Sequence, residues 1–260
     1  MKLRKLTLLL ISAAAVCALL PGCKNAASES VTGLEHPALR AVDRIVQYTH
    51  YTVSYNEADR LPYWTAYQLT AEHTDGPVIR KGMSFIRDER VNMMQANKVD
   101  YVRSGWTRGH MVPAGDFKWD EEAMRETFFF TNCCPQDSIL NDGDWQVLER
   151  KARNMARRYG VLYIATGPVI GNRINGTIGR NDITVPDAFF KALLARKANG
   201  QYTGVGFLMQ NNSKRQPLRE CAMPLEKLEQ ITGLKFFAEL PEKDAKEVKK
   251  RYIPADWGLR

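Results

Sequence analysis

The segment at about residues 143–158 constrains the fold most, because it combines length with clear helical periodicity. Leu148, Ala152, Met155 and Ala156 follow the spacing i, i+4, i+7 and i+8, which places them on one face of a helix. The basic residues of the segment lie off that face: Arg150, Lys151, Arg153, Arg157 and Arg158. A helix with one apolar face must pack against another layer of structure, which the rest of the chain has to supply.

Most other regular segments predict strands, and these supply that layer. Residues 44–55 and 62–70 are rich in β-branched and aromatic side chains, and Asn56 and Asp59 between them have turn character. Further strands are expected at 83–87, from 160 to about 170, and at 183–185, 189–194 and 202–209. A second helix is expected at 224–231. The sequence therefore predicts an α+β fold in which helices flank a mixed, mainly antiparallel central sheet.

The N-terminal segment is typical of a lipoprotein signal. The basic stretch MKLRK precedes the apolar run LTLLLISAAAVCALL, which has signal-peptide length and is too short for a membrane span. The sequence L-P-G-C at 20–23 resembles the bacterial lipobox, although Pro21 departs from the usual small or β-branched residue. We expect a signal peptide at 1–22, a lipidated Cys23 within a flexible tether at 23–37, and one domain at 38–260. The alternative is ordinary signal-peptidase cleavage nearby, with Cys23 incidental.

The expected lipid anchor has consequences for location. An acylated Cys23 would tether an exported protein to a membrane without spanning it. Lys24 follows it in place of the aspartate associated with inner-membrane retention, which favours the outer membrane, facing either the periplasm or the exterior. No later segment has the roughly 18 apolar residues that a membrane-spanning helix needs.

Charge and cysteine content restrict the partners only weakly. The formal net charge is +8, part of which lies in the expected signal peptide, so the domain is moderately basic and suits a polyanionic partner without requiring one. An exported domain can form disulfides. The adjacent residues Cys133 and Cys134 rarely bond each other in such an arrangement, and a bond from either to Cys221 stays open. No CxxC or CxxH spacing indicates a zinc site.

Of the four histidines, His110 has the neighbours most suited to catalysis. Gly109 lets the backbone come close to a ligand, and Arg108 offers a planar fork of donors that suits phosphate. Three more polar residues follow at intervals of nine and eight: Asn132, Asn141 and Glu149. Each of the four also has a structural interpretation. His110 could be a packed loop histidine, and Asn132 could be a turn residue before Pro135. Asn141 could be a helix N-cap, and Glu149 could be a solvated helix carboxylate.

Several motifs follow one another in a specific order. The chain carries W-T-R-G-H-M-V-P-A-G-D at 106–116, T-N-C-C-P-Q at 131–136 and L-N-x-x-x-W-x-x-L-E at 140–149. These are followed by T-G-P at 166–168, V-P-D-A-F-F-K at 185–191 and L-E-x-I-T-G-L-x-F-F at 228–237. The ordered series, which spans most of residues 51–240, resembles the DNA/RNA non-specific endonucleases, the ββα-metal nucleases of the endonuclease G type. The resemblance implies a ββα-metal core within the α+β fold.

The resemblance also implies an activity, namely hydrolysis of DNA and RNA to 5′-phosphate and 3′-hydroxyl ends. It assigns His110 as the general base that activates water, which a neutral imidazole can do near pH 7. It assigns Asn141 as the direct ligand of one Mg²⁺, for which Mn²⁺ could substitute, and Glu149 as a residue that acts through metal-bound water. Arg108 would hold phosphate, and Asn132 would order the site loop or the metal waters.

Recognition of the nucleic-acid backbone is expected. A second phosphate-binding arginine is expected among Arg80, Arg87 and Arg90, with Arg80 as the candidate. The basic residues at 150–158 have two interpretations that the sequence leaves open: a track that binds nucleic acid, or a solvated helix face. Because nothing in the scheme uses the 2′-hydroxyl or the base edges, both sugars and most sequences should be accepted. The sequence leaves the oligomeric state open, including a homodimer.

Thr107 departs from the family, which usually has aspartate before Arg-Gly-His. Since that aspartate is not the general base, we expect activity to survive, with a change in rate or metal preference. Three alternatives stay open: a lipoprotein that captures nucleic acid for uptake, a phosphodiesterase for small substrates, and a toxin with a separate immunity protein. The presence of His110, Asn141 and Glu149 together argues against a loss of catalysis.

Overall fold

A computed structural model describes residues 33–259 of the chain. A seven-stranded antiparallel sheet forms its centre, with the strand order β1-β2-β3-β6-β9-β10-β11. Its strands are β1 (Arg44–Gln47), β2 (Tyr51–Asn56), β3 (Leu61–Thr70), β6 (Val161–Val169), β9 (Ala188–Arg196), β10 (Tyr202–Gln210) and β11 (Ala222–Met223). Two small sheets pair β4 (Thr107–His110) with β5 (Cys133–Gln136) and β7 (Thr177–Ile178) with β8 (Ile183–Thr184).

Most of the helices are short. They are α1 (Glu121–Glu126), α2 (Gln146–Tyr159), α3 (Leu218–Cys221), α4 (Leu225–Thr232) and α5 (Glu242–Lys250). A π-helical segment, η5 (Leu140–Trp145), leads directly into α2. Short 3-10 helices lie at η1 (Glu72–Thr74), η2 (Lys98–Tyr101), η3 (Ala114–Asp116), η4 (Phe130–Asn132) and η6 (Pro254–Trp257). Among residues 33–259, none of the helices combines the length and hydrophobicity that a bilayer crossing requires.

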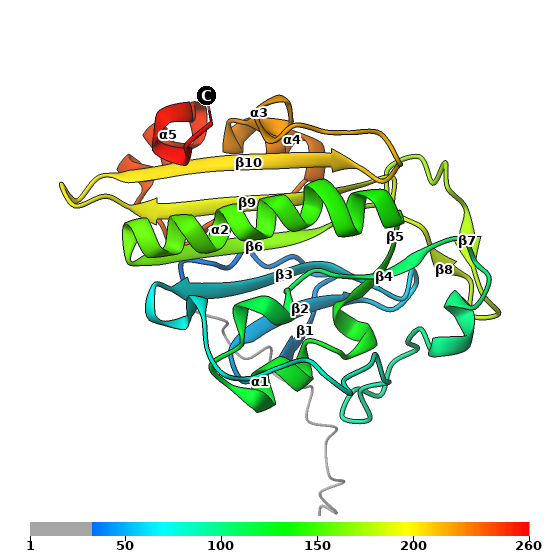
Figure 1. The fold of residues 1–260 in the computed structure, drawn as a ribbon. Coiled ribbons are helices and arrows are strands. Elements are labelled where there is room, and N and C mark those ends of the chain that lie inside the picture. The colour runs from blue at the N-terminus through cyan, green and yellow to red at the C-terminus, as the bar shows by residue number, and fades with distance from the viewer. Residues whose placement is uncertain (1–32, 260) are drawn as a thin grey trace, which may run out of the picture. The chain divides into compact units, whose positions relative to one another are not determined.

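Helices cover both faces of the seven-stranded sheet (Figure 1). α2 packs on one face against β6 and β9, whereas α4 and α5 pack on the other face against β10. The alternation of side chains along β9 accounts for both contacts. Phe189 and Leu193 join the apolar cluster beneath α2, and Phe190 and Leu194 join the cluster beneath α4. The residues predicted to form the apolar face of α2 are all buried.

The predicted α+β class with its mainly antiparallel sheet is confirmed. β3, β6, β9, β10 and α4 lie close to their predicted positions, and α4 ends at Gly233, whose left-handed φ of 70° suits glycine. The single strand predicted at 44–55 is wrong. A turn closed by the hydrogen bond from Tyr48 N to Tyr51 O, 2.8 Å, divides it into β1 and β2. The strand predicted at 83–87 is also wrong, since only an isolated bridge between Ile86 and Phe129 forms there.

The folded part of the chain begins earlier than residue 38. Glu35 and His36 are buried, and His36 Nε2 lies 3.1 Å from Thr52 Oγ1. Gln68 Nε2 donates to Glu35 Oε2 at 2.9 Å. The predicted flexible tether is therefore wrong for its last residues, which pack on the domain. The predicted signal peptide and Cys23 lie outside the described residues.

Cys133, Cys134 and Cys221 are all buried free thiols. Burial raises the pKa of the Cys133 thiol to about 12 and that of Cys221 to about 11. The bond to Cys221 that the sequence left open is not formed. These thiols behave as small apolar core residues.

Candidate active site

Strands β4 and β5 and helix α2 form a ββα unit. β4 pairs antiparallel with β5, so that His110 lies opposite Cys133. Immediately after β5, Asp137 Oδ1 accepts hydrogen bonds from Ile139 N at 2.8 Å and from Leu140 N at 3.1 Å. The carboxylate thus caps the helical segment that continues through η5 into α2. This cap starts the helical segment directly after the end of β5.

Gly109 is required by packing rather than by an unusual backbone angle. A Cβ at this position would overlap Gln136 Oε1 and lie 2.8 Å from Gln136 Cβ. Gln136 is fully buried, and no described residue forms a hydrogen bond with its amide group. β4 therefore lies directly against this side chain. Any larger residue at 109 would displace the strand, and with it Arg108 and His110 on either side.

A cleft of about 350 Å³ opens beside β4 and the start of α2. Five of the residues predicted for the site line it together: Arg80, Arg108, His110, Asn141 and Glu149. Arg108 and His110 both come from β4, whereas Arg80, Asn141 and Glu149 come from other segments of the chain, and only the fold brings these segments together. Thr107, the departure from the family pattern, also lines the cleft, whereas Asn132 does not.

His110 has the environment of a neutral base. Its ring lies beside Phe85 and Phe128, at centroid distances of 4.4 Å and 4.8 Å. Its Nε2 is buried, and no described residue forms a hydrogen bond with it. Burial, and then the charge of Arg80, lower the pKa of His110 to about 3. An uncharged imidazole that lines the cleft can accept a proton from a water molecule there.

The candidate arginines have different surroundings. Arg108 and Arg80 are exposed, line the cleft and pair with no carboxylate of residues 33–259. The guanidinium of Arg80 lies 5.8 Å from the centroid of the Phe128 ring. Arg90 is committed to two carboxylates, at 3.1 Å each, and neither Arg90 nor Arg87 lines the cleft. Among the three candidates for a second phosphate-binding arginine, the geometry favours Arg80.

Thr107 fixes the orientation of Asn141. Thr107 Oγ1 donates its single proton to Gln136 O at 2.7 Å, so it can only accept the hydrogen bond from Asn141 Nδ2 at 3.1 Å. The amide oxygen of Asn141 therefore points away from Thr107, and no group of residues 33–259 donates to it. Asn141 lies inside η5, after the cap formed by Asp137, so its alternative interpretation as an N-cap is wrong.

Glu149 is a second oxygen donor of the cleft. Within residues 33–259 its carboxylate has no hydrogen-bond donor or ion-pair partner in contact. Burial raises the pKa of Glu149 to about 7, against the opposing charge of Lys191. Oxygen donors with room for water suit Mg²⁺, which keeps several waters in protein sites. Asn141 and Glu149 fit such an ion, although the described residues place no three His, Cys, Asp or Glu side chains together as ligands.

Asn132 lies behind the cleft and orders the loop after His110. It is fully buried, and its Oδ1 accepts a hydrogen bond from Val112 N at 2.9 Å. Its Nδ2 donates to Val112 O and to Thr127 O, each at 2.9 Å. These three bonds commit both ends of the amide to the backbone. Of the two roles that the resemblance implied for Asn132, the geometry favours ordering of the site loop over contact with metal-bound water.

Most basic side chains of α2 interact with the protein itself. Arg153 pairs with the buried carboxylate of Asp116 at 2.6 Å. Lys151 and Arg158 donate to backbone carbonyls of residues 255–258 and so hold the C-terminal segment. For these three residues the geometry favours a structural role over a nucleic-acid track.

Buried charged residues that the sequence did not predict lie behind the cleft. Asp116 accepts hydrogen bonds from Tyr67 Oη at 2.7 Å and from Arg153 Nη1 at 2.6 Å. Lys191 of β9 is fully buried, and its Nζ has no hydrogen-bond partner among the described residues. A lysine inside an otherwise apolar predicted strand was the only sequence signal for this layer. Nothing local in the sequence links Asp116 to Tyr67.

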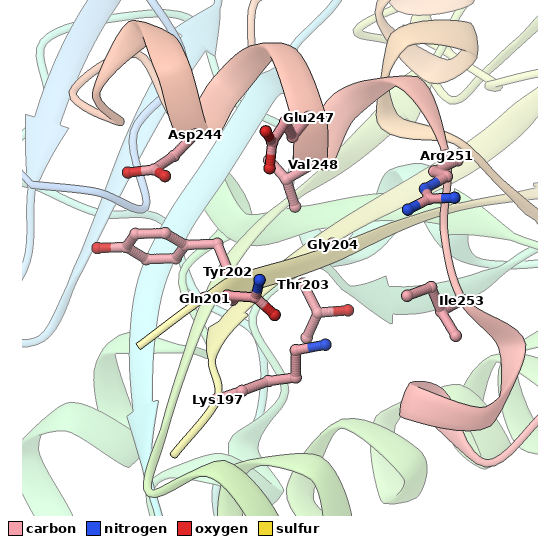
Figure 2. Close-up of a pocket in the computed structure, with 10 residues that line it drawn as sticks. All are labelled: Lys197, Gln201, Tyr202, Thr203, Gly204, Asp244, Glu247, Val248, Arg251 and Ile253. Carbon is pink, nitrogen blue, oxygen red and sulfur yellow. The ribbon is translucent and has the colours of Figure 1, made fainter. Parts of the chain in front are cut away.

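A second, smaller recess of about 130 Å³ lies between α5 and the start of β10 (Figure 2). Its lining combines the cations Lys197 and Arg251 with the carboxylates Asp244 and Glu247. Lys197 is already paired with Asp256 at 3.2 Å. The recess shares no lining residue with the cleft and has no histidine in its lining, so it offers no comparable chemistry.

Known proteins resemble the chain over most of its length. A sequence model of the DNA/RNA non-specific endonuclease family matches residues 35–243. The chain is 31% identical to mitochondrial endonuclease G of Bos taurus over 246 residues, which is 90% of this chain and 82% of that protein. It is 35% identical over 208 residues to the mitochondrial nuclease EXOG of Xenopus laevis, covering 75% of this chain but only 58% of that relative.

A solved structure resembles the chain in fold. The crystal structure of the EndoG/EndoGI complex, which addresses the mechanism of EndoG inhibition, contains a chain that matches with a TM-score of 0.74 at 28% identity. The match covers 80% of this chain and 90% of that chain. The family model, the relatives and the solved structure all indicate the same family of nucleases. The chain therefore belongs to the DNA/RNA non-specific endonuclease family.

Proposed function

We propose that this chain is a metal-dependent nuclease that hydrolyses phosphodiester bonds in both DNA and RNA and leaves 5′-phosphate and 3′-hydroxyl ends. One observation carries the proposal. The neutral imidazole of His110 lines the same cleft as the oxygen donors Asn141 and Glu149. The cations Arg80 and Arg108, which pair with no carboxylate of residues 33–259, line it as well. A base, a place for a metal ion and phosphate-binding charge are what phosphodiester hydrolysis requires.

His110 acts as the general base. Its lowered pKa keeps the imidazole neutral at physiological pH, and the ring, which lines the cleft, accepts the proton of the attacking water. Arg108 and Arg80 hold the phosphoryl oxygens and offset their charge. A phosphate bound against Arg80 also cancels part of the charge that lowers the pKa of His110. Substrate binding thus makes the histidine a stronger base at the moment when it is needed.

We assign Mg²⁺ as the metal, with Mn²⁺ as a substitute, and Asn141 Oδ1 as its direct protein ligand. When bound, the ion neutralises charge on the phosphate and stabilises the departing 3′ oxygen. Thr107 keeps the Asn141 amide turned for this contact. Glu149 accepts hydrogen bonds from water on its side of the cleft, and so orders the solvent around the reacting phosphate.

The substrate class follows from what these side chains contact. Guanidinium groups and a metal ion bind phosphate oxygens, which are the same in DNA and RNA. None of the assigned roles uses a 2′-hydroxyl or a base edge. The proposal therefore includes both polymers, little sequence preference and affinity that weakens as salt is added.

The test is digestion of plasmid DNA and total RNA by the domain from Lys24 onward. Reactions contain Mg²⁺, Mg²⁺ with excess EDTA, or the His110→Ala variant with Mg²⁺. We expect cleavage of both polymers that EDTA and His110→Ala each abolish. Intact polymers with Mg²⁺ and with Mn²⁺, together with a salt-sensitive gel shift, would replace the proposal with a binding protein. Cleavage confined to a dinucleotide or bis-aryl phosphate would indicate a small-molecule phosphodiesterase.

We also propose that Cys23 carries a lipid that anchors the exported enzyme to a bacterial membrane, with the outer membrane favoured. The lipobox-like L-P-G-C and the lysine that follows it support this proposal. Metabolic labelling with a palmitate analogue should mark the wild-type protein and not Cys23→Ser. Equal labelling of the two, or release of the unlabelled wild-type protein in soluble form, would contradict the anchor.

A further inference from the structure

A further hollow, of about 690 Å³, lies next to the cleft along the chain. It is called the arginine hollow here, because Arg103 and Arg180 line it. Ser104 lines this hollow, and Thr107 lines the cleft. Three residues of fully extended chain span at most about 11 Å, so the backbones of these two lining residues are no farther apart than that. A ligand longer than this distance can occupy both openings at once.

The arginine hollow carries positive charge that the protein does not neutralise. Arg103 and Arg180 are exposed, and neither guanidinium pairs with a carboxylate of residues 33–259. Within that part of the chain, Asp100 is the only acidic residue in the lining. Its buried carboxylate accepts hydrogen bonds from Asn181 Nδ2 at 2.9 Å and from Arg180 N at 3.1 Å. Asp100 therefore binds uncharged donors and leaves both guanidinium groups available to an anion.

Asp100 also fixes the two arginines relative to each other. It belongs to η2, three residues before Arg103, and its hydrogen bonds reach the turn after β7 that carries Arg180. Gly179 packs directly against this side chain, since a Cβ at position 179 would lie 2.4 Å from Asp100 Cβ. Two segments about 80 residues apart are thus joined tightly at the base of the hollow. The hollow is a built feature of the fold and not a gap between loose loops.

Arg103 adopts a backbone conformation that is uncommon for its residue type. Its φ of 56° lies in the left-handed region, which favours glycine, asparagine and aspartate. Ser104 holds this turn, because its hydroxyl donates to Tyr101 O at 3.0 Å and accepts from Trp106 N at 3.1 Å. Such conformations gather at ligand-binding sites, where the surrounding structure maintains them. An arginine at this position supports a binding role for its side chain.

We propose that the arginine hollow binds phosphate groups of the substrate strand beyond the cleft, through Arg103 and Arg180. The inference rests on the proposed nuclease function, since the ligand is the same nucleic acid. Phosphates of one strand follow one another every 3.4 Å or so along a duplex axis, roughly the spacing needed for several to span the distance between the two openings. Guanidinium groups bind phosphate oxygens of DNA and RNA alike. The exposed side chains of Val99 and Val102 offer apolar contact to the sugar carbons.

The arginine hollow makes affinity depend on the length of the substrate. A very short oligonucleotide fills the cleft alone, whereas a longer strand reaches the hollow as well. Each phosphate that an arginine binds releases counterions, so the longer strand should bind more tightly and with a steeper dependence on salt. The enzyme should therefore favour polymers over short oligonucleotides.

Single substitutions of the two arginines test the inference. Fluorescence anisotropy measures the binding of labelled single-stranded DNA and RNA, of 3 and of 12 nucleotides, in EDTA. We expect Arg103→Gln and Arg180→Gln each to raise the Kd of the 12-mers about fivefold at 0.1 M salt and to reduce the slope of log affinity against log salt by about 0.7, as for one lost phosphate contact. The affinity gained between 3 and 12 nucleotides should shrink accordingly.

Arg251→Gln is the matched control. It removes the same charge from an exposed arginine in the recess between α5 and β10, which shares no lining residue with the cleft or with the arginine hollow. Its Kd and salt slope should stay near those of the wild type. An equal loss of affinity in all three variants would indicate a general effect of net charge and would overturn the inference.

A second variant adds repulsion instead of removing attraction. Val102→Glu places a carboxylate on an exposed side chain of the hollow and should weaken binding of the 12-mers at least as much as either arginine variant. Unchanged affinity for nucleic acid, together with an altered sedimentation coefficient of Val102→Glu, would make the hollow an interface between copies of the chain and overturn the inference.

Failure of this inference can be told from failure of the proposed function. If the wild-type protein binds the 12-mers but cleaves no polymer with Mg²⁺ or Mn²⁺, the proposed function fails, whereas the comparison of Kd values still decides the role of the hollow. If the wild type cleaves both polymers and the two arginine variants bind like Arg251→Gln, only the hollow is refuted. A wild-type protein that binds no 12-mer in EDTA or in Ca²⁺ would overturn both.

Discussion

Thr107 Oγ1 donates to Gln136 O at 2.7 Å and accepts from Asn141 Nδ2 at 3.1 Å, so one hydroxyl links β5 to η5 across the edge of the cleft. A carboxylate at this position would accept from Asn141 but could not donate to the Gln136 carbonyl. Threonine in place of the usual aspartate therefore still accepts the hydrogen bond from the Asn141 amide and also donates one to the backbone of β5. The threonine is compatible with an active site.

Replacement of Thr107 tests directly whether its hydroxyl orients the Asn141 amide. Thr107→Val keeps the shape of the side chain and removes both hydrogen bonds, which together contribute about 1–3 kcal/mol. We expect the dissociation constant of Mn²⁺, measured by calorimetric titration of the metal-free protein, to rise about tenfold. Thr107→Ser keeps the hydroxyl and should bind Mn²⁺ like the wild type. Equal affinity of the valine and serine variants would show that the hydroxyl does not orient Asn141.

Gly109→Ala should destabilise the pairing of β4 with β5. The added Cβ overlaps Gln136, and such overpacking costs about 1–3 kcal/mol in the free energy of unfolding. Gln136→Ala removes the overlapping amide. Urea unfolding of the double variant should therefore show a smaller loss than the sum of the two single losses. Strict additivity would mean that the two residues are not in conflict.

His110 should make the stability of the metal-free protein sensitive to acid. Its pKa is lowered from 6.5 to about 3 in the folded state, by burial first and then by Arg80. Between these pH values the unfolded chain binds a proton that the folded chain does not, so stability falls as the pH is lowered. Urea unfolding of His110→Asn at pH 7 and pH 4 should show a smaller fall than the wild type. A larger or equal fall would contradict the neutral, buried imidazole.

Arg80→Ala should have two effects. Removal of the charge should raise the pKa of His110, which NMR of the imidazole can follow in the metal-free protein. It should also raise KM and reduce the slope of log affinity against log salt by about 1, as expected for one lost phosphate contact. Arg87→Ala is the matched control, because Arg87 lies outside the cleft. Identical salt slopes for the two variants would remove Arg80 from the substrate site.

Local patterns in the sequence were enough for the larger elements. The apolar stripe of α2 and the alternation in β9 and β10 are recorded within each segment, so these elements were predicted close to their bounds. β4 and β5 were missed because each is only four residues long and because Gly109 and Pro135 disfavour strands. Their pairing depends on residues far apart in the chain.

The candidate site shows the same limit. The motif series placed His110, Asn141 and Glu149 in one site, and the cleft contains all three. Motif spacing could not predict the hydrogen bond between Thr107 and Asn141, or the effect of the Lys191 charge on Glu149. Both depend on which strand faces which helix, a tertiary relationship that no single segment records.

The most direct test of the account is the single-turnover cleavage rate of one defined DNA duplex and one defined RNA by wild-type protein and His110→Ala. The dissociation constant of each substrate is measured on the same samples in Ca²⁺. The account predicts a rate about 10²–10⁴-fold lower for the variant on both polymers, as for loss of a general base, with unchanged affinity. Equal rates for the two proteins, or a loss explained by weaker binding alone, would contradict His110 as the catalytic base.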